Sequence, residues 1–600
     1  MDRFDATVAF PINEGPMADP QTTLGAAVTR AIEAALGPEL AGTDPVVRST
    51  SNPGFGDYQA NFAMKLAKPL GRPPRQIADA VVAQLDLGGV CSSVEVAGAG
   101  FVNLTLDDGF LGATTGTLLG DDRLGVVAAG APERVIVDYS APNVAKEMHV
   151  GHLRTTIIGD ALCRVLGWLG HEVTRQNHIG DWGTPFGMLI EHLLDVGETE
   201  AAHRLSVGDM TAFYQEARAK FDADPAFAER ARRRVVTLQA GDAQTLRLWH
   251  ILVEESKRYF NAVYDRLGVL LGDDDLAGES LFNDRLPALV AELERDGLAV
   301  VDQGALCVFP DGFIGRDATP LPLIIRKSDG GFGYAATDLA ALQYRTTDLD
   351  GQRIIYVVDA GQSQHLQMVF AVGRMAGWLA DGKARAEHVA FGIVLGADGG
   401  RLRTRSGANP RLVDLLDEAV ERAAAAVAEK NPDLSAETQA AVARAVGIGA
   451  VKYADLSNQR IKDYTFDWER MLSFEGNTAA YLQNAYVRIR SIFRRGDVAT
   501  VGPADAGAIV VTTPEERALT IALLRLDLVV QAVAETLEPH HLCTYLFDLA
   551  QAFTAFYEAC PVLRAPSPTV QRSRLVLCEL TARTLATGLG LLGIDTVEQM

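Results

Sequence analysis

The chain has 600 residues, which allows roughly three or four domains, and its 48% hydrophobic and 22% charged residues are ordinary for a globular protein. The net charge of −22 argues against a general nucleic-acid coat protein, because phosphate binding needs cations, but it leaves room for an enzyme with one basic face. The six cysteines are scattered without a Cys-x-x-Cys pair, and neither a secretory leader nor a membrane-spanning apolar run is evident. We therefore expect no structural zinc, no membrane association and a reduced cytoplasmic setting.

Residues 1–115 are expected to form a small α+β domain after an irregular, proline-containing lead-in. Its helices and strands are predicted at residues 23–36, at a segment ending near residue 68, and at residues 74–85, 93–96 and 101–106. The segment Ala97-Gly-Ala-Gly100 is a turn signal between the two strands. From the residues alone, structural support is the simplest role for this domain.

The most informative stretch is a predicted strand, Val135 to Val137, that leads through a loop into an amphipathic helix expected over residues 153–169. His149 and His152 lie three residues apart, close to one helical turn, so both imidazoles fall on one face at the helix start. A helix start offers unpaired N–H groups and a positive dipole end to an anionic phosphate.

Two neighbours of the histidines strengthen this interpretation. Lys146 adds a mobile positive charge, and Gly151 lets a flat adenine lie against the backbone. The motif is short enough to arise by chance, but it sits at the strand-to-helix turn where doubly wound folds bind nucleotides. Zinc is the alternative ligand for two histidines, but Glu147 points elsewhere on the turn and no third ligand is evident. The stretch predicts a site that holds ATP while its α-phosphate is attacked.

Two sequence blocks carry a family resemblance. Residues 140–154, Ser-Ala-Pro-Asn-Val-Ala-Lys-Glu-Met-His-Val-Gly-His-Leu-Arg, resemble the signature of class I arginyl-tRNA synthetases of bacterial type, and residues 177–188 resemble the next block of that family. The resemblance covers nearly the whole chain and implies an α/β fold. The domains that it implies are an N-terminal α+β domain that contacts tRNA (1–115), a Rossmann-like parallel-sheet catalytic domain with insertions (130–410), a helical connecting, stem-contacting region (411–470) and an all-α anticodon-binding domain (471–600).

The same resemblance implies the reaction of an arginine–tRNA ligase. ATP activates L-arginine to arginyl-adenylate, and the arginyl group then passes to the 3′ end of tRNA(Arg). Lys146, His149 and His152 would stabilise the charge on the reacting phosphate, and Mg²⁺ would accompany ATP, held mainly by its phosphates. The resemblance also implies that activation needs bound tRNA. We expect a monomer.

Between the motif and the next informative segment, the expected order is a strand at residues 172–176, helices over 186–271 and a strand-rich inserted lobe over 299–325. The basic cluster at residues 230–234 is typical of a solvated helix face, with a contact to the tRNA acceptor end as the alternative.

Residues 330–340 contain a candidate amino-acid site. Tyr334 and Asp338 are four residues apart and share one side of a helix, and a carboxylate suits the planar fork of a guanidinium. Capping of the helix by Asp338 is the alternative. The resemblance implies that arginine is bound by Asp138, Asn143, Tyr334, Asp338 and Gln362, the last of which follows a strand predicted at 353–358. Gln364 is close enough to be confused with Gln362.

A glycine-rich loop follows a strand predicted at residues 389–395 and carries Arg401, Arg403 and Arg405. A solvated basic hairpin is the simple interpretation, and binding of a triphosphate is the functional one. The loop resembles the mobile Lys-Met-Ser-Lys-Ser segment of class I synthetases, with Arg401 and Thr404 in place of its two lysines. The resemblance then implies ATP binding by Asn143, His149, Gly151, His152, Arg401 and Thr404. It also implies catalytic roles for Lys146, which supplies the missing charge, and for Arg403 and Arg405.

The remainder is predicted to be helical, at residues 411–430, 436–456, 480–493, 514–535, 541–560 and 571–592. Arginine, tyrosine and amide side chains are mixed in 480–493, which suits RNA phosphates and unpaired bases, although a bundle helix with buried tyrosines explains part of this pattern. Two rival functions remain: an adenylyl-transferring enzyme without tRNA, and a non-catalytic tRNA-binding paralogue.

Overall fold

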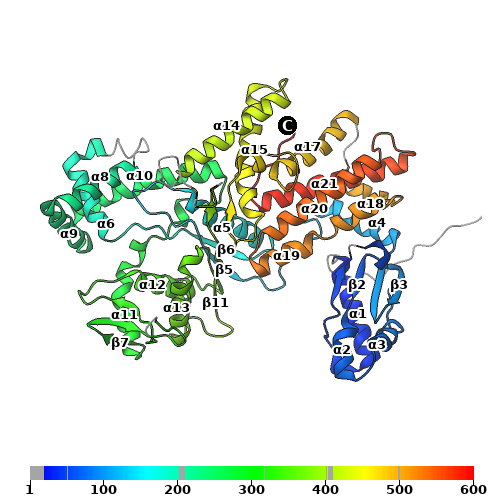
Figure 1. Ribbon diagram of the computed structural model, residues 1–600, viewed down its shortest axis with the longest axis horizontal. Coiled ribbons are helices and arrows are strands. Elements are labelled where there is room, and N and C mark those ends of the chain that lie inside the picture. Colours follow the sequence, from blue (N-terminus) through cyan, green and yellow to red (C-terminus); the bar gives the residue numbers. More distant parts are fainter. Residues whose placement is uncertain are drawn as a thin grey trace, which may run out of the picture.

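The computed structural model describes residues 19–50, 52–201, 210–315, 318–396, 398–400, 402, 410–496 and 501–600. The N-terminal domain, in blue, and a green lobe lie at the two lower sides of the molecule, and the orange and red helices lie above the blue domain (Figure 1). A parallel sheet at the centre joins these parts. In the described residues, no helix is long and apolar enough to cross a membrane.

The N-terminal domain is a four-stranded antiparallel sheet in the order β1-β2-β4-β3, packed against helices. Its elements are α1 (Pro20–Leu36), β1 (Val47–Ser49), β2 (Tyr58–Ala60), α2 (Phe62–Leu70), α3 (Pro74–Val82), β3 (Cys91–Ala97), β4 (Phe101–Leu106) and α4 (Asp108–Thr117). The predicted helices and both predicted strands are confirmed. The sequence missed β1 and β2, because three-residue strands are too short to show alternation.

The central sheet is parallel throughout and has the order β11-β10-β5-β6. Its strands are β5 (Arg134–Asp138), β6 (Glu172–Gln176), β10 (Arg353–Tyr356) and β11 (Arg385–His388), and α5 (Val150–Trp168) follows β5. The inner strands β5 and β10 are almost wholly buried, as expected for a parallel sheet with both faces covered. Their carboxyl ends lie side by side and open onto the motif loop.

The strand predicted at residues 389–395 is wrong in position. The true fourth strand, β11, lies just before it and is an edge strand whose Arg385 and Glu387 form ion pairs, so it carries little apolar signal. The apolar residues Val389 and Phe391, which contributed to the predicted strand, are buried just beyond the end of β11. Only β12 (Val394–Leu395) is extended, and it pairs with β13 (Tyr464–Thr465).

Two inserted segments flank the sheet. Helices α6 (Thr184–Val196), α8 (Met210–Ala223), α9 (Pro225–Gln239) and α10 (Ala243–Leu267) form one of them. The other is the green lobe, which consists of α11 (Leu286–Arg295), the antiparallel strands β7 (Ala299–Asp302), β8 (Ala305–Val308) and β9 (Leu323–Arg326), and α12 (Tyr334–Thr347). Helix α13 (Ser363–Met375), which connects β10 to β11, packs against α12. The predicted lobe is confirmed (Figure 1).

The remaining helices are α14 (Leu412–Lys430), α15 (Ala436–Leu456), α16 (Trp468–Met471), α17 (Ala479–Gly496), α18 (Pro514–Leu523), α19 (Leu526–Thr536), α20 (His540–Ala559) and α21 (Pro568–Leu591). The single helix predicted over 514–535 is wrong, because the chain breaks between α18 and α19. No glycine or proline marks this break. The hydroxyl of Tyr545 donates to the carbonyl of Ala522 at 3.1 Å, a tertiary contact at the end of α18 that the local sequence does not reveal.

A buried ion pair joins α5, which follows the central strand β5, to the C-terminal helices. Arg154 Nε of α5 lies 3.0 Å from Asp455 Oδ2 of α15, and both side chains are essentially inaccessible. Arg154 Nη1 also donates to the carbonyl of Lys462. Loss of either partner would leave a buried uncompensated charge, so this contact fixes α5 against α15.

Candidate active site

A cavity of about 590 Å³ opens at the carboxyl ends of β5 and β10. Seven of the residues predicted for the site line it: Asp138, Asn143, His149, Gly151, His152, Asp338 and Gln362. They come from the end of β5, the motif loop, the start of α5, helix α12 and the loop after β10. Sequence-distant candidates for phosphate and guanidinium binding therefore share one cavity, at the edge where parallel sheets bind ligands.

The two histidines form a reciprocal cap at the start of α5. His149 is the N-cap residue, and its Nδ1 accepts from the N–H of Gly151 at 3.0 Å. His152 is the third helical residue, and its Nδ1 accepts from the N–H of His149 at 3.1 Å. Because Nδ1 is an acceptor in both rings, a neutral imidazole carries its proton on Nε2. Both rings are thus preset as Nε2–H donors.

The electrostatics of the cap keep both rings neutral. Burial, followed by the charge of His149, lowers the pKa of His152 to about 3, and burial and Lys146 lower the pKa of His149. The ring centroids are 4.1 Å apart. The histidines therefore act as fixed hydrogen-bond donors at neutral pH, and the mobile cation of the motif is Lys146.

The structure also explains why position 151 is a glycine, independently of any bound nucleotide. A Cβ atom at this position would lie 2.7 Å from Cε1 and 2.8 Å from Nδ1 of His149. Any side chain here would displace the His149 ring from the cap, so glycine is required by the protein itself.

The loop between β5 and α5 holds three non-glycine residues in the left-handed region: Ser140 (φ 73°), Ala141 (φ 47°) and Ala145 (φ 57°). Each donates its backbone N–H to a side chain from another element, and the acceptors are Thr155 Oγ1, Asn177 Oδ1 and Ser256 Oγ, respectively. Such strain persists only where surrounding contacts over-determine the backbone, and it is typical of functional sites.

Lys146 does not line the cavity, although it lies in the motif loop. Its ammonium stands 4.4 Å from the ring centre of Tyr214 in α8, a cation–π contact. Its charge still acts on both histidines. The predicted role of Lys146 in catalysis stays a prediction.

Asp138 ends β5 and already has a cationic partner. Its Oδ2 lies 2.9 Å from Nη2 of the fully buried Arg345, which also donates through Nε to Gln176. The other oxygen, Oδ1, is buried without a hydrogen-bond partner in the described part of the chain. One carboxylate oxygen is thus held by Arg345, whereas the other is buried and unpartnered in a residue that lines the cavity.

Three carboxyl or imidazole groups meet on the opposite side of the cavity. Asp338 Oδ2 lies 2.6 Å from His365 Nε2, and this hydrogen bond raises the pKa of His365. Burial, followed by the negative charges of Asp181 and Asp338, raises the pKa of Glu279 to about 7. Glu279 and His365 both line the cavity and were missed in the sequence. Glu279 begins an irregular 3₁₀ segment without a motif, whereas the proximity of His365 to Gln362 was a usable signal.

The remaining predicted residues divide into three groups. Gln362 lines the cavity and Gln364 does not, which separates these two candidates. Tyr334 begins α12, is 77% exposed and is not among the lining residues, so its contact with arginine stays a prediction. Arg401, Arg403, Thr404 and Arg405 lie outside the described residues.

The donor set of the cavity fits a nucleotide. Two neutral N–H donors at a helix start suit phosphate oxygens. In the described part of the chain, no three His, Cys, Asp or Glu side chains of this cavity converge closely enough to hold a metal ion by themselves. The residues present are therefore compatible with Mg²⁺ carried by the phosphates of ATP.

Family models match three successive parts of the chain. They are described as "Arginyl tRNA synthetase N terminal domain" over residues 22–106, "tRNA synthetases class I (R), catalytic domain" over 114–468 and "DALR anticodon binding domain" over 482–600.

Whole-chain relatives agree with these matches. The chain is 59% identical over 585 residues to an arginine–tRNA ligase of Thermobifida fusca, covering 97% of this chain and 100% of that one. It is 50% identical to a Synechococcus elongatus arginine–tRNA ligase, covering 97% and 100%. The arginyl-tRNA synthetase structure from Plasmodium falciparum matches with a TM-score of 0.83 at 29% identity, covering 98% and 100%. That from Thermus thermophilus matches with a TM-score of 0.78 at 27% identity, covering 97% and 100%. The chain therefore belongs to the arginyl-tRNA synthetase family of class I tRNA synthetases.

Proposed function

We propose that the cavity activates L-arginine with ATP and that the chain then transfers the arginyl group to tRNA(Arg). The observation that supports this most directly is the union of neutral phosphate donors, His149 and His152, with acidic groups, Asp338 and Glu279, in one cavity. The substrate carboxylate attacks the α-phosphate of ATP, and pyrophosphate leaves. No protein nucleophile takes part, so catalysis consists of positioning and charge stabilisation.

The phosphate side uses the reciprocal histidine cap. The Nε2–H groups donate to phosphate oxygens as negative charge develops on these oxygens. Because the cap already fixes both rings through Nδ1, the imidazoles do not have to reorient during the reaction. Lys146 adds a full positive charge when it leaves Tyr214 for the triphosphate. We assign Asn143, Gly151, Arg401 and Thr404 to ATP binding, and Arg403 and Arg405 to charge stabilisation.

The arginine side uses the acids. The guanidinium replaces His365 as the partner of Asp338 and also faces Glu279, so one fork meets two carboxylates. Tyr334 covers the ligand from the exposed start of α12. Asn143, Gln362 and Asp138, whose Oδ1 has no hydrogen-bond partner among the described residues, contact the substrate from the sheet edge. Lysine would present a point charge and leave one acid without a matching donor.

A second cavity, of about 860 Å³, supports binding of the anticodon loop by the C-terminal helices. It is lined by four arginines, Arg488, Arg494, Arg495 and Arg564, and by the half-exposed ring of Tyr557. Positive charge beside an accessible aromatic ring suits phosphates and unpaired bases. We further propose that residues 1–115 contact the outer part of tRNA, that 411–470 contact its stem, and that the enzyme acts as a cytoplasmic monomer.

Three measurements on the purified chain separate this function from its rivals: labelling of tRNA, pyrophosphate exchange and binding of tRNA. Radiolabelled arginine is incubated with bulk tRNA and the purified chain, with and without ATP and Mg²⁺. We expect ATP-dependent labelling of tRNA. Arginine-dependent pyrophosphate exchange without labelled tRNA would favour the adenylyl-transferring enzyme, and binding of tRNA without either reaction would favour the non-catalytic paralogue.

We expect His152→Ala and Lys146→Ala each to lower adenylate formation by at least about tenfold, because each removes stabilisation of the reacting phosphate. Pyrophosphate exchange in the presence of tRNA measures this step, and arginine affinity should change little. His152→Asn is the matched control for the cap, since its amide oxygen can still accept from His149 N–H without supplying Nε2–H. A His152→Asn variant with normal exchange would show that the cap alone matters.

The variant Asp338→Asn should weaken arginine binding by roughly 10- to 100-fold, because one charge-assisted partner of the guanidinium is lost. Asp329→Asn is the control, since Asp329 is exposed and accepts from the N–H of its neighbour Gly331. An arginine titration by calorimetry provides the measurement. Equal dissociation constants in the wild type and Asp338→Asn would contradict the assignment.

Arginine affinity should rise with pH through the titration of Glu279. Its carboxyl has a pKa of about 7 without ligand, and only the ionised form attracts a guanidinium. The ionised fraction grows about tenfold between pH 6 and pH 8, so the apparent dissociation constant should fall by about that factor. Glu279→Gln should flatten this dependence to the smaller part that His365 contributes. An unchanged slope in Glu279→Gln would remove Glu279 from the site, and Glu254→Gln, an exposed acid on α10, is the control.

A further inference from the structure

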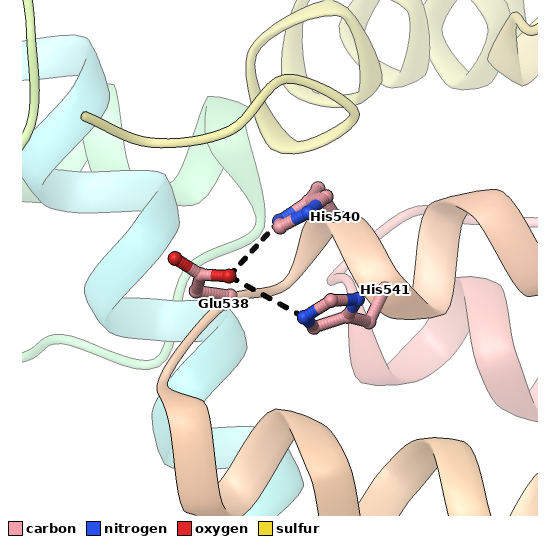
Figure 2. A group of neighbouring side chains, drawn as sticks. All are labelled: Glu538, His540 and His541. Atoms are coloured by element: carbon pink, nitrogen blue, oxygen red, sulfur yellow. Dashed lines mark ion pairs between the residues drawn. The ribbon is translucent and has the colours of Figure 1, made fainter. Parts of the chain in front are cut away.

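A second group of ionisable side chains lies far along the chain from the active-site motifs, at the turn between α19 and α20. Figure 2 shows the rings of His540 and His541 directed toward the carboxylate of Glu538. Glu538 Oε2 is 3.8 Å from His540 Nδ1 and 3.3 Å from His541 Nε2. In the part of the chain that the structure describes, this is the one group of three His, Cys, Asp or Glu side chains with ligand atoms within 4.8 Å of one another.

The two histidines are neighbours in sequence, yet their rings converge. The ring centroids are 4.2 Å apart and the ring planes differ by only 32°. This tilted arrangement brings one nitrogen of each ring toward the same carboxylate oxygen. Three potential ligand atoms thus surround one point at the start of α20.

One of these atoms is buried without a hydrogen bond. His540 Nδ1 is inaccessible and has no hydrogen-bond partner in the described residues. The His540 side chain is only 13% exposed, whereas His541 is 40% and Glu538 31% exposed. An unpartnered buried nitrogen lone pair, with an open side formed by the other two residues, is suited to accept a cation that enters from solvent.

We propose that Glu538, His540 and His541 form a binding site for a divalent transition-metal ion of the zinc type. Ligand atoms around tetrahedral zinc, with bonds of about 2.0–2.1 Å, are about 3.3 Å apart, close to the separations found here. Two imidazoles and one carboxylate favour zinc, cobalt or nickel over magnesium, which demands oxygen ligands. Three protein ligands leave the fourth position to water.

The surroundings limit the affinity and indicate what the ion would do. Arg460 and Lys462 place positive charge near His540 and oppose a cation. Arg460 is, however, held by backbone carbonyls: its Nε donates to Leu537 O and its Nη1 to Ala390 O. Ala390 precedes Phe391 and Gly392, which line the active-site cavity. An ion at the turn would therefore brace the contact between the C-terminal helices and the catalytic domain.

The test uses the full-length chain after dialysis against a chelator. Cobalt(II) is titrated and followed by visible absorption, which reports tetrahedral coordination, and zinc is titrated by calorimetry. We expect one equivalent to bind, zinc to displace cobalt, millimolar magnesium to leave both signals unchanged, and saturating zinc to raise the thermal midpoint by about 2 °C. His540→Ala and Glu538→Gln should each weaken zinc binding at least tenfold.

His250→Ala controls for adventitious binding by an exposed histidine, since His250 lies on α10 outside the cluster. The control should bind zinc as the wild type does. The proposal is overturned if the wild type shows no tetrahedral cobalt spectrum, or if His540→Ala and Glu538→Gln retain the wild-type affinity. Metal-free thermal midpoints of all variants establish that each is folded, so a loss of binding reports the site itself.

Discussion

The loop that turns β5 into α5 is the constraint on which the active site depends. Three of its residues adopt left-handed backbone angles, and side chains from three other elements accept their N–H groups. This loop places His149 and His152 at the carboxyl edge of the sheet, where α12 brings Asp338. These contacts hold the strained backbone, and with it the start of α5, so both imidazoles are fixed at the cavity.

The electrostatics of the two subsites are complementary and largely preset. The histidines are kept neutral by burial, so they contribute directed donors without a charge that would repel the guanidinium. Of the acids that line the cavity, Asp338 is hydrogen-bonded to His365, and the raised pKa of Glu279 keeps part of that carboxyl group protonated near neutral pH. Under the proposed function, a guanidinium would satisfy both acids at once. The free protein therefore avoids two uncompensated carboxylates in a half-buried cavity.

Much of this architecture is readable in the sequence, and the failures have physical causes. The apolar runs of β5 and β10 predict buried strands, and the spacing of His149 and His152 predicts two imidazoles on one face at a helix start, whereas their reciprocal capping bonds appear only in the structure. The edge strand β11 escaped because ion pairs replace its apolar signal. Glu279 escaped because its environment is created by contacts between distant segments. The pair Glu538 and His540 was visible as sequence, but only the fold shows that their ligand atoms converge.

Asp138 illustrates why a site residue cannot be assigned from position alone. The sequence places it at the end of β5, and the structure adds Arg345, a fully buried cation that occupies one of its oxygens. Arg345 is anchored in turn by Gln176 at the end of β6 and lies 4.9 Å from the ring centre of Tyr356 at the end of β10. Side chains at the ends of three adjacent strands, β5, β6 and β10, thus contact the same guanidinium. Asp138 is therefore both a structural partner of Arg345 and one of the residues that line the cavity. Substitution here would disturb the contacts that join three strand ends, whereas substitution of Asp338 would remove the partner of His365 at the cavity.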